Sequence, residues 1–183
     1  MEITGFDIPD IKVVRADVAH EANRSTSYFY DAAAFEKGGV STGWVQDHAS
    51  FYPVKGTVRG LHFQQPPIAQ HKLVRVSRGR VFDVAVDVRK TSPTYGRYVS
   101  IELSAENWIM LFVPIGFAHG FCTLEPDTEV VFRITQPNTA GYLGGLFWND
   151  PALQIPWPCG DRPNVIFPVD ETLPTLDKLN SPF

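Results

Sequence analysis

The fold is decided by a stretch in the middle of the chain, Lys72-Leu73-Val74-Arg75-Val76-Ser77-Arg78-Gly79-Arg80-Val81-Phe82-Asp83-Val84-Ala85-Val86-Asp87-Val88. Within residues 81–88, side chains alternate between a face that carries two aspartates and a face that is wholly apolar. This period of two is typical of a half-buried β-strand. The apolar run 73–77 predicts a second strand, and the Arg78-Gly79-Arg80 between the two runs predicts a hairpin turn.

Short strand patterns recur on the C-terminal side of this stretch. They predict strands at residues 98–103, 110–113, 120–124 and 129–135, separated by turn residues. Such closely spaced short strands are typical of an all-β sandwich or barrel. One short helix is expected over residues 28–37, and the eight prolines of residues 137–183 predict loops with short helical turns. Without a repeat or a linker, residues 1–183 are expected to form one domain.

The charge of the chain is unevenly distributed. The net charge is −4, yet nine Lys and Arg residues lie between Lys55 and Arg97, with only Asp83 and Asp87 as acids. The rest of the chain is therefore strongly acidic. An acidic protein with one basic stretch argues against nucleic-acid or membrane partners and is compatible with a compact anionic ligand.

The sequence predicts a cytoplasmic protein. The start, Met1 to Asp7, has neither a basic nor an apolar segment of a signal peptide. The longest apolar run, 108–118, is interrupted by proline and glycine and is shorter than the about 20 residues of a membrane span. Cys122 and Cys159 form no disulfide framework and have no metal-type spacing.

Two histidines lie in informative contexts. His119 ends the pattern Pro114-x-Gly116-x-x-His119, which resembles the second half of the cupin double motif, where this histidine commonly binds a metal. The first half of that motif would supply further ligands, but the sequence after His62 is Phe63-Gln64-Gln65-Pro66-Pro67. A catalytic metal needs about three protein ligands, so a metal is not expected here. Histidines oriented by a carboxylate can instead act as acid and base.

Several longer motifs occur in a fixed order: Arg59-Gly60-Leu61-His62-Phe63-Gln64, Lys72-Leu73-Val74-Arg75-Val76, residues 79–88, Leu103-Ser104-Ala105-Glu106-Asn107 and residues 113–121. Together they resemble the dTDP-4-dehydrorhamnose 3,5-epimerase family. The resemblance is dense from Trp44 to Thr135 and continues loosely to Asp170. It implies a cupin-like jelly roll with short peripheral helices, a homodimer, and catalysis without a metal or organic cofactor.

The resemblance also implies the chemistry and the residues that perform it. In a nucleotide-linked 4-keto-6-deoxyhexose, the ketone acidifies the hydrogens at C3 and C5, and removal of one gives an enolate. The expected base is His62, oriented by Asp170, and Lys72 is expected to stabilise the enolate oxygen. The residues expected to bind the substrate are Arg59 at the diphosphate, together with His119 and Gln46.

The family's general acid is a tyrosine on the strand after the histidine motif, and the matching residue here is Phe132. A phenyl ring cannot donate a proton, and the loss of one acid lowers a rate by about 10²–10⁴-fold. The sequence therefore predicts inversion at C3 with impaired inversion at C5. A normal 3,5-epimerase with a replacement acid remains the alternative.

The residues that would bind the nucleotide also depart from the family pattern. Arg24 matches the family's N-terminal arginine only with a shift of one residue, and His48 replaces an asparagine. A pair of tyrosines is replaced by Pro137-Asn138, which leaves the identity of the base open because aromatic rings stack on bases. The rings that could stack instead are Trp44, Phe51 and Tyr52.

Three other function classes remain open from the sequence. An isomerase could move the keto group between C3 and C4 on the same scaffold. A catalytically inactive cupin could bind sugar nucleotides only, which Phe132 and the altered loops favour weakly. A metal-dependent oxygenase is disfavoured by the missing ligands around His62 and His119.

Overall fold

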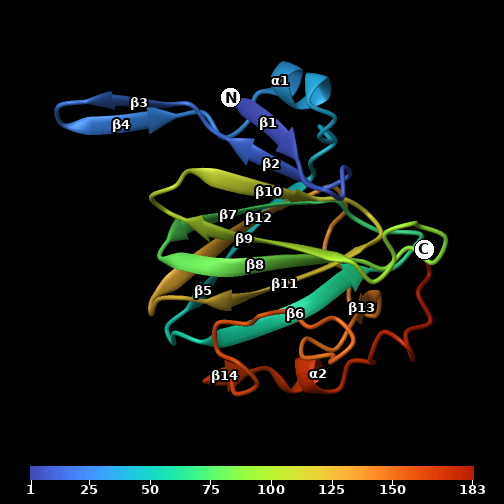
Figure 1. The fold of residues 1–183 in the computed structure, drawn as a ribbon. Coiled ribbons are helices and arrows are strands. Elements are labelled where there is room, and N and C mark those ends of the chain that lie inside the picture. The colour runs from blue at the N-terminus through green and yellow to red at the C-terminus, as the bar shows by residue number, and fades with distance from the viewer.

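The protein, described by a computed structural model of residues 1–183, is built from two facing β-sheets (Figure 1). The first sheet has the order β1 (Glu2–Gly5), β2 (Lys12–Arg15), β10 (Ile109–Val113), β7 (Lys72–Arg78), β12 (Thr128–Ile134) and β5 (Gln46–Tyr52). The second has the order β13 (Leu143–Gly145), β6 (Thr57–Gln64), β11 (Phe117–Thr123), β8 (Arg80–Asp87) and β9 (Tyr98–Ser104), and β14 (Val165–Ile166) pairs with β6. This arrangement confirms the predicted all-β, cupin-like jelly roll.

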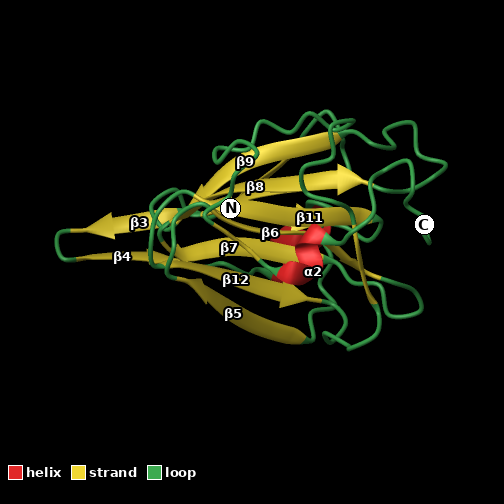
Figure 2. Cartoon of the chain, turned by 90° about the horizontal axis from the view of Figure 1, so that it is seen from below, coloured by secondary structure: helices red, strands yellow, loops and turns green.

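The remaining elements lie outside the two sheets. A hairpin of β3 (Val18–Glu21) and β4 (Arg24–Ser27) projects beyond the barrel in both ribbon views (Figures 1 and 2). Helix α1 (Ala32–Lys37) is shorter than the predicted helix, because Asp31 accepts a hydrogen bond from the backbone of Ala34 and caps its start. Helix α2 (Pro168–Glu171) packs near β6. No helix of this structure is long and apolar enough to cross a membrane.

The predicted hairpin between residues 73–77 and 81–88 is wrong. Strand β7 lies in the first sheet between β10 and β12, whereas β8 lies in the second sheet between β11 and β9. Both edges of β7 are already occupied, so β8 has no place beside it. Gly79 makes the corner at a positive φ of 74°, where an added Cβ would come within 2.5 Å of the Thr128 side chain.

The two faces of β8 are as the sequence predicts, but the strand is not half-buried. Val81 and Ala85 point between the sheets, whereas Val84 and Val86 point to the other side. That outer face is covered by the C-terminal segment, which contributes Trp148 and other apolar side chains. Asp83 and Asp87 share the inward face with Val81 and Ala85, and neither aspartate has any exposed surface.

The space between the sheets is filled unevenly. Apolar side chains from β2, β8, β9 and β10 close one part of it, including Val13, Ala85, Leu103 and Leu111. Between β5, β7 and β12 on one side and β6 and β11 on the other, a cavity remains. The cavity is therefore lined by the inward faces of β5, β6, β7, β11 and β12, which carry polar side chains.

Candidate active site

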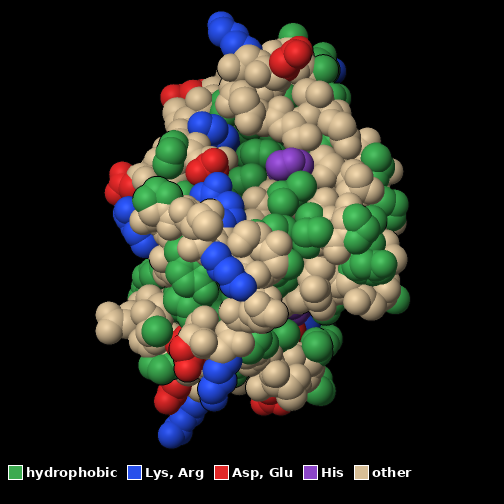
Figure 3. All heavy atoms as spheres, turned by 90° about the vertical axis from the view of Figure 1, so that its right-hand side faces the viewer, with side chains coloured by type: hydrophobic (Ala, Val, Ile, Leu, Met, Phe, Trp, Pro, Cys, Tyr) green, Lys and Arg blue, Asp and Glu red, His purple; other side chains and the backbone are tan.

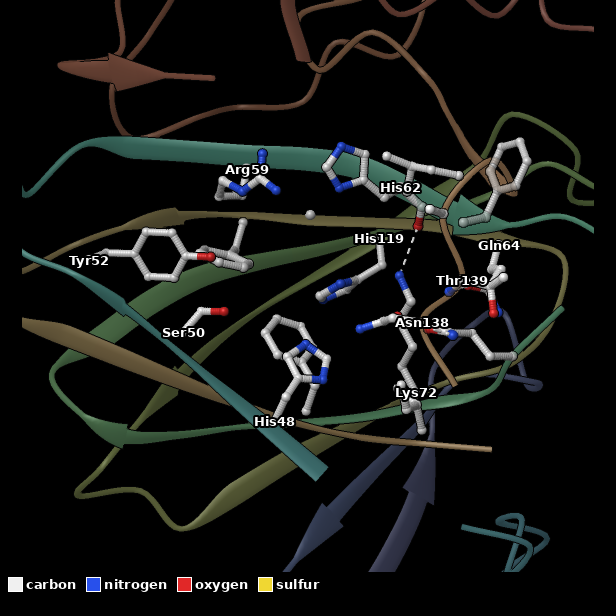
Figure 4. A pocket seen from close by; sticks show the side chains of 18 residues that line it. His48, Ser50, Tyr52, Arg59, His62, Gln64, Lys72, His119, Asn138 and Thr139 are labelled. Atoms are coloured by element: carbon white, nitrogen blue, oxygen red, sulfur yellow. Dashed lines mark hydrogen bonds between the residues drawn. The ribbon is translucent and has the colours of Figure 1, made fainter. Parts of the chain in front are cut away.

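The cavity has a volume of about 340 Å³ and is lined by two walls (Figure 4). The first-sheet wall carries His48, Ser50, Tyr52, Lys72 and Phe132, and the second-sheet wall carries Arg59, His62, Gln64, His119 and Phe121. Residues 138–140 and Leu143 close one side. The sequence-predicted residues Arg59, His62, Lys72, His119, Phe132 and His48 are therefore brought together around one space.

His62 is held by Asp170, which reaches β6 from α2. The Nε2 of His62 lies 2.5 Å from one carboxylate oxygen of Asp170. The other oxygen accepts from Arg59 at 2.5 Å and from the backbone N–H of Gly60 at 3.2 Å. An ionised carboxylate can only accept, so Nε2 of His62 carries the hydrogen and Nδ1 is left to receive a proton. The carboxylate thereby fixes the tautomer that a base requires.

An irregularity at Gly60 lets both Arg59 and His62 line the cavity. The two residues are three positions apart, and in a regular strand they would point to opposite faces. Gly60 has φ of 104°, and an added Cβ would lie 2.6 Å from the carbonyl oxygen of His119. The register between β6 and β11 also shifts at this point. A side chain at position 60 would therefore disturb both the candidate base His62 and the candidate substrate-binding residue Arg59.

The environment keeps His62 neutral and Asp170 ionised near neutral pH. Burial lowers the pKa of His62 below its usual value, although the hydrogen bond and the charge of Asp170 oppose this effect. Burial alone would raise the pKa of Asp170, but the hydrogen bond with His62 and the positive charge of Arg59 bring it below its usual value. A neutral imidazole beside a carboxylate is the resting state of a general base.

Lys72 enters the cavity from the first-sheet wall. Its Nζ donates to the carbonyl oxygen of His62 at 3.1 Å, as the dashed line in Figure 4 shows. Burial lowers the pKa of Lys72 to about 8, while the negative charge of Asp83 acts in the opposite direction. The ammonium therefore remains mostly protonated at neutral pH and can stabilise a developing negative charge.

His119 forms a second histidine–aspartate pair on the same wall as His62. Its Nε2 lies 2.8 Å and 3.0 Å from the two carboxylate oxygens of Asp83, and both residues are buried. Burial raises the pKa of Asp83, whereas the charges of His119 and Lys72 lower it in part. Within the chain, no three His, Cys, Asp or Glu side chains are grouped to hold a metal ion.

Phe132 and His48 lie side by side on the first-sheet wall, opposite the second-sheet histidines. They are cross-strand partners, and their rings stack with centroids 4.8 Å apart and planes 11° apart. The Nδ1 of His48 is buried and has no hydrogen-bond partner. Burial, together with the charge of Lys72, lowers the pKa of His48. This wall therefore offers an unengaged imidazole beside an aromatic ring that has no polar atom.

Two predicted substrate contacts lie outside the cavity lining. Gln46 stands at the rim, where its side-chain oxygen accepts a hydrogen bond from the backbone of Asn138. Arg24 lies on the projecting hairpin and forms a bidentate ion pair with Glu21, so it does not reach the cavity of its own chain. Gln46 therefore positions the loop that closes the cavity.

Among the three rings considered for base stacking, only Tyr52 lines the cavity. Trp44 packs edge-on against Phe112, and Phe51 is 52% exposed on the outward face of β5. The alternation of β5 explains the result, since His48, Ser50 and Tyr52 occupy every second position and point inward.

The sequence did not point to Asp83 as part of the site, and it pointed to the loop at residues 138–140 only through Pro137-Asn138, where the family has a pair of tyrosines. The available signal for Asp83 was a charged side chain between the apolar Val81 and Ala85 on one strand face. Thr139 and Ala140 had no such signal, because long-range contacts hold this loop beside the cavity. The backbone of Thr139 donates to Gln64 at 3.0 Å, and the Gln64 amide donates to the Pro137 carbonyl at 3.1 Å.

The basic stretch is divided between the cavity and structural ion pairs. Arg59 and Lys72 line the cavity, whereas Arg89 donates to the buried Asp87 at 2.7 Å and Arg80 to Glu125 at 2.7 Å. On the face shown in Figure 3, basic and acidic side chains are interspersed. The excess of cations along the sequence therefore does not form one continuous surface patch on this face.

Comparison with known proteins gives the family. The model of the dTDP-4-dehydrorhamnose 3,5-epimerase family matches residues 5–178. The chain belongs to this family. The dTDP-4-dehydrorhamnose 3,5-epimerase of Sinorhizobium fredii is 48% identical over 158 residues, which cover 86% of this chain and 81% of the relative. The chain is thus an enzyme of the isomerase class, of the dTDP-sugar epimerase type.

Solved structures of epimerases from this family superimpose on the protein over nearly the whole chain. The enzyme from Bacillus anthracis, with TDP and pyrophosphate bound, has a TM-score of 0.91 and 38% identity over 95% of this chain and 98% of that one. The enzyme from Legionella pneumophila, in complex with dTDP-4-keto-L-rhamnose, has a TM-score of 0.91 and 33% identity over 98% and 94%.

Proposed function

We propose that this epimerase acts on a nucleotide diphosphate-linked 4-keto-6-deoxyhexose of the dTDP-4-dehydro-6-deoxyglucose type and inverts C3. His62 removes the proton next to the ketone, and Asp170 orients His62 and stabilises its cationic form. The observation that carries this proposal is the short His62–Asp170 contact, made by a carboxylate without exposed surface at the edge of a cavity of sugar size. The ligands of the two superimposed relatives support the substrate class.

Other cavity residues supply binding and charge stabilisation. The Lys72 ammonium stabilises the enolate oxygen that forms when the proton leaves C3. Arg59, which is held against Asp170 and lies over the Phe167 ring at 4.2 Å, contacts the diphosphate through its remaining N–H groups. His119 contacts the sugar, and the mechanism needs no cofactor because side chains provide both the base and the positive charge.

We propose that C5 is inverted poorly because Phe132 stands where the family has its acid tyrosine. Inversion requires that a proton leave one face of the carbon and return to the other. Phe132 lines the first-sheet wall and has no proton to donate. Tyr52 lies in the cavity on the same wall and is the ring proposed to stack on the nucleotide base.

The proposed functional unit is a homodimer in the cytoplasm. The outward face of the first sheet supports a dimer, because it exposes Phe51, and Val45 just before β5 is 59% exposed. Light scattering coupled to size-exclusion chromatography would give about twice the 20.4 kDa chain mass for the dimer. A mass equal to one chain would contradict it.

The epimerase is tested by incubation with dTDP-4-keto-6-deoxyglucose in deuterated water, followed by NMR of the sugar. Deuterium at C3 with inversion, and little of either at C5, is the expected outcome. Equal deuterium and inversion at both carbons would overturn the C3 selectivity but not the epimerase. Migration of the keto group to C3 would identify the isomerase alternative, and no exchange at all would identify a protein that only binds sugar nucleotides.

A further inference from the structure

We infer that His48 is a catalytic residue, the proton donor that acts on the sugar from the face opposite His62. The inference rests on the proposed epimerase function and adds the missing acid to it. It assigns a catalytic role to a side chain that the sequence pointed to only as a substrate contact. His48 lies on the edge strand β5 of the first sheet, and His62 lies on β6 of the second.

The first argument is the position of the two imidazoles. The cavity lies between the sheets, so a sugar bound there has His62 on one side and His48 on the other. In Figure 4 the two rings stand at opposite sides of the space, and His119 lies between them in that view. Inversion of a carbon requires a base and an acid on opposite faces, and these two walls provide that arrangement.

The second argument is the contact between His48 and Phe132. The imidazole covers the face of the Phe132 ring at a centroid distance of 4.8 Å. The donor is therefore displaced by one strand, from β12 to its neighbour β5, while it stays on the same wall of the cavity. An aromatic partner fixes the ring orientation without occupying either nitrogen.

The third argument is the unsatisfied nitrogen. Nδ1 of His48 is buried without a hydrogen-bond partner, whereas His62 and His119 each engage a carboxylate through Nε2. An unpaired buried polar atom costs free energy, and a structural histidine would normally be partnered. A bound sugar that presents an oxygen or a carbanionic carbon to this ring would satisfy it.

The proposed inversion needs only side chains of the site and protons from solvent. His62 takes the proton from C3, and the C–H electron pair becomes part of the enolate, whose oxygen is held by Lys72. The His48 imidazolium then gives its N–H proton to the opposite face of C3, the enolate electrons form the new C–H bond, and the C4 carbonyl is restored. Solvent removes the proton from His62 and returns one to His48 after the product leaves.

The charges around His48 set the direction of its pH dependence. The other charged or titratable side chains that line the cavity are Lys72, Tyr52, Arg59, His62 and His119. The buried carboxylates of Asp83 and Asp170 are hydrogen-bonded to His119 and His62, and Asp47 and Arg133 pair with each other on the outward face. Burial and Lys72 lower the pKa of His48, so the protonated donor is a minor form at neutral pH. C3 inversion should therefore become faster as the pH falls from about 7.5 to 6.5, toward the pKa of the donor.

The experiment compares His48→Asn, Phe132→Tyr and the double variant in deuterated water with dTDP-4-keto-6-deoxyglucose, using His20→Asn as the control because His20 is exposed on the projecting hairpin. His48→Asn should lose inversion at C3 by about 10²-fold or more, the typical contribution of a general acid. The double variant should regain inversion because the new tyrosine hydroxyl replaces the donor, and its rate should not rise between pH 7.5 and 6.5.

The possible results separate this inference from the proposed function. A wild-type enzyme that exchanges no deuterium would refute the epimerase itself. A wild-type enzyme that inverts C3, together with a folded His48→Asn variant of unchanged rate, would refute only the role of His48. Regained inversion in the double variant would support the role even if His48→Asn melts at a lower temperature. A double variant that folds but stays inactive would contradict it.

Discussion

On the second-sheet wall, each histidine is hydrogen-bonded to a carboxylate without exposed surface, whereas on the first-sheet wall His48 has a buried nitrogen without a partner and stacks on Phe132. The partnered histidines have a fixed tautomer and orientation. The imidazole of His48 is positioned only by ring stacking, so substrate must complete its hydrogen bonding. The difference supports the proposed division of roles, in which the second-sheet wall removes the proton and the first-sheet wall returns it.

The largest expected effect comes from breaking the His62–Asp170 pair. Asp170→Asn should lower C3 exchange by about 10³–10⁴-fold, because the amide can no longer stabilise a cationic His62. His62→Asn is the matched variant, since it leaves the contacts of Asp170 with Arg59 and Gly60 in place. Deuterium exchange at C3 measures both variants. Exchange within tenfold of wild type in a folded Asp170→Asn protein would show that the pair is not the base.

The second-largest loss of rate is expected from substitution of Lys72. Lys72→Met should lower kcat by about 10²–10³-fold, the typical loss when a group that stabilises transition-state charge is removed. Because burial lowers the pKa of Lys72 to about 8, the wild-type rate should also decline as the pH rises through about 8, when the ammonium loses its proton. A pH profile of kcat for wild type and Lys72→Arg checks this. Arginine stays charged, so a decline at the same pH in Lys72→Arg would assign it to another group.

A smaller effect on C3 inversion is expected from the His119–Asp83 pair. Asp83→Asn keeps one acceptor for Nε2 of His119 but removes the negative charge that opposes the effect of burial on Lys72. C3 inversion should fall by about tenfold, equivalent to about 1.4 kcal/mol, and the decline caused by Lys72 should move to lower pH. A pH profile of the C3 inversion rate distinguishes an electrostatic role of Asp83 from a structural one. A purely structural role would lower the rate without shifting the pH at which Lys72 loses its proton.

The strand pattern and the residues on motif strands could be predicted from the sequence. The alternation in residues 81–88 correctly assigned side chains to two faces, because the direction of a side chain in a strand is a local property. The pairing of β7 with β10 and β12 was not predictable in this way, since it depends on segments far along the chain. For the same reason the burial of both faces of β8, which depends on the C-terminal segment with Trp148, was missed.

In the site, too, residues within sequence motifs could be predicted, whereas residues placed by contacts between distant segments could not. The sequence motifs pointed to His62, Lys72, His119 and Phe132 as site residues, and in the structure all four line one cavity. Asn138 was predicted only as the replacement for a family tyrosine, and the position of its loop beside the cavity depends on hydrogen bonds to Gln46 and Gln64, which are distant in the sequence. Arg24 lies on a hairpin whose position relative to the cavity no local pattern could give.

The role of position 132 is measured by the ratio of deuterium at C5 to deuterium at C3 in Phe132→Tyr relative to wild type, with Phe132→Leu as the variant that also lacks a donor. The tyrosine hydroxyl should raise inversion and deuterium at C5 by about 10²-fold, while Phe132→Leu should keep the low wild-type ratio. Equal ratios in wild type and Phe132→Tyr would contradict the claim that position 132 decides how many carbons the enzyme inverts.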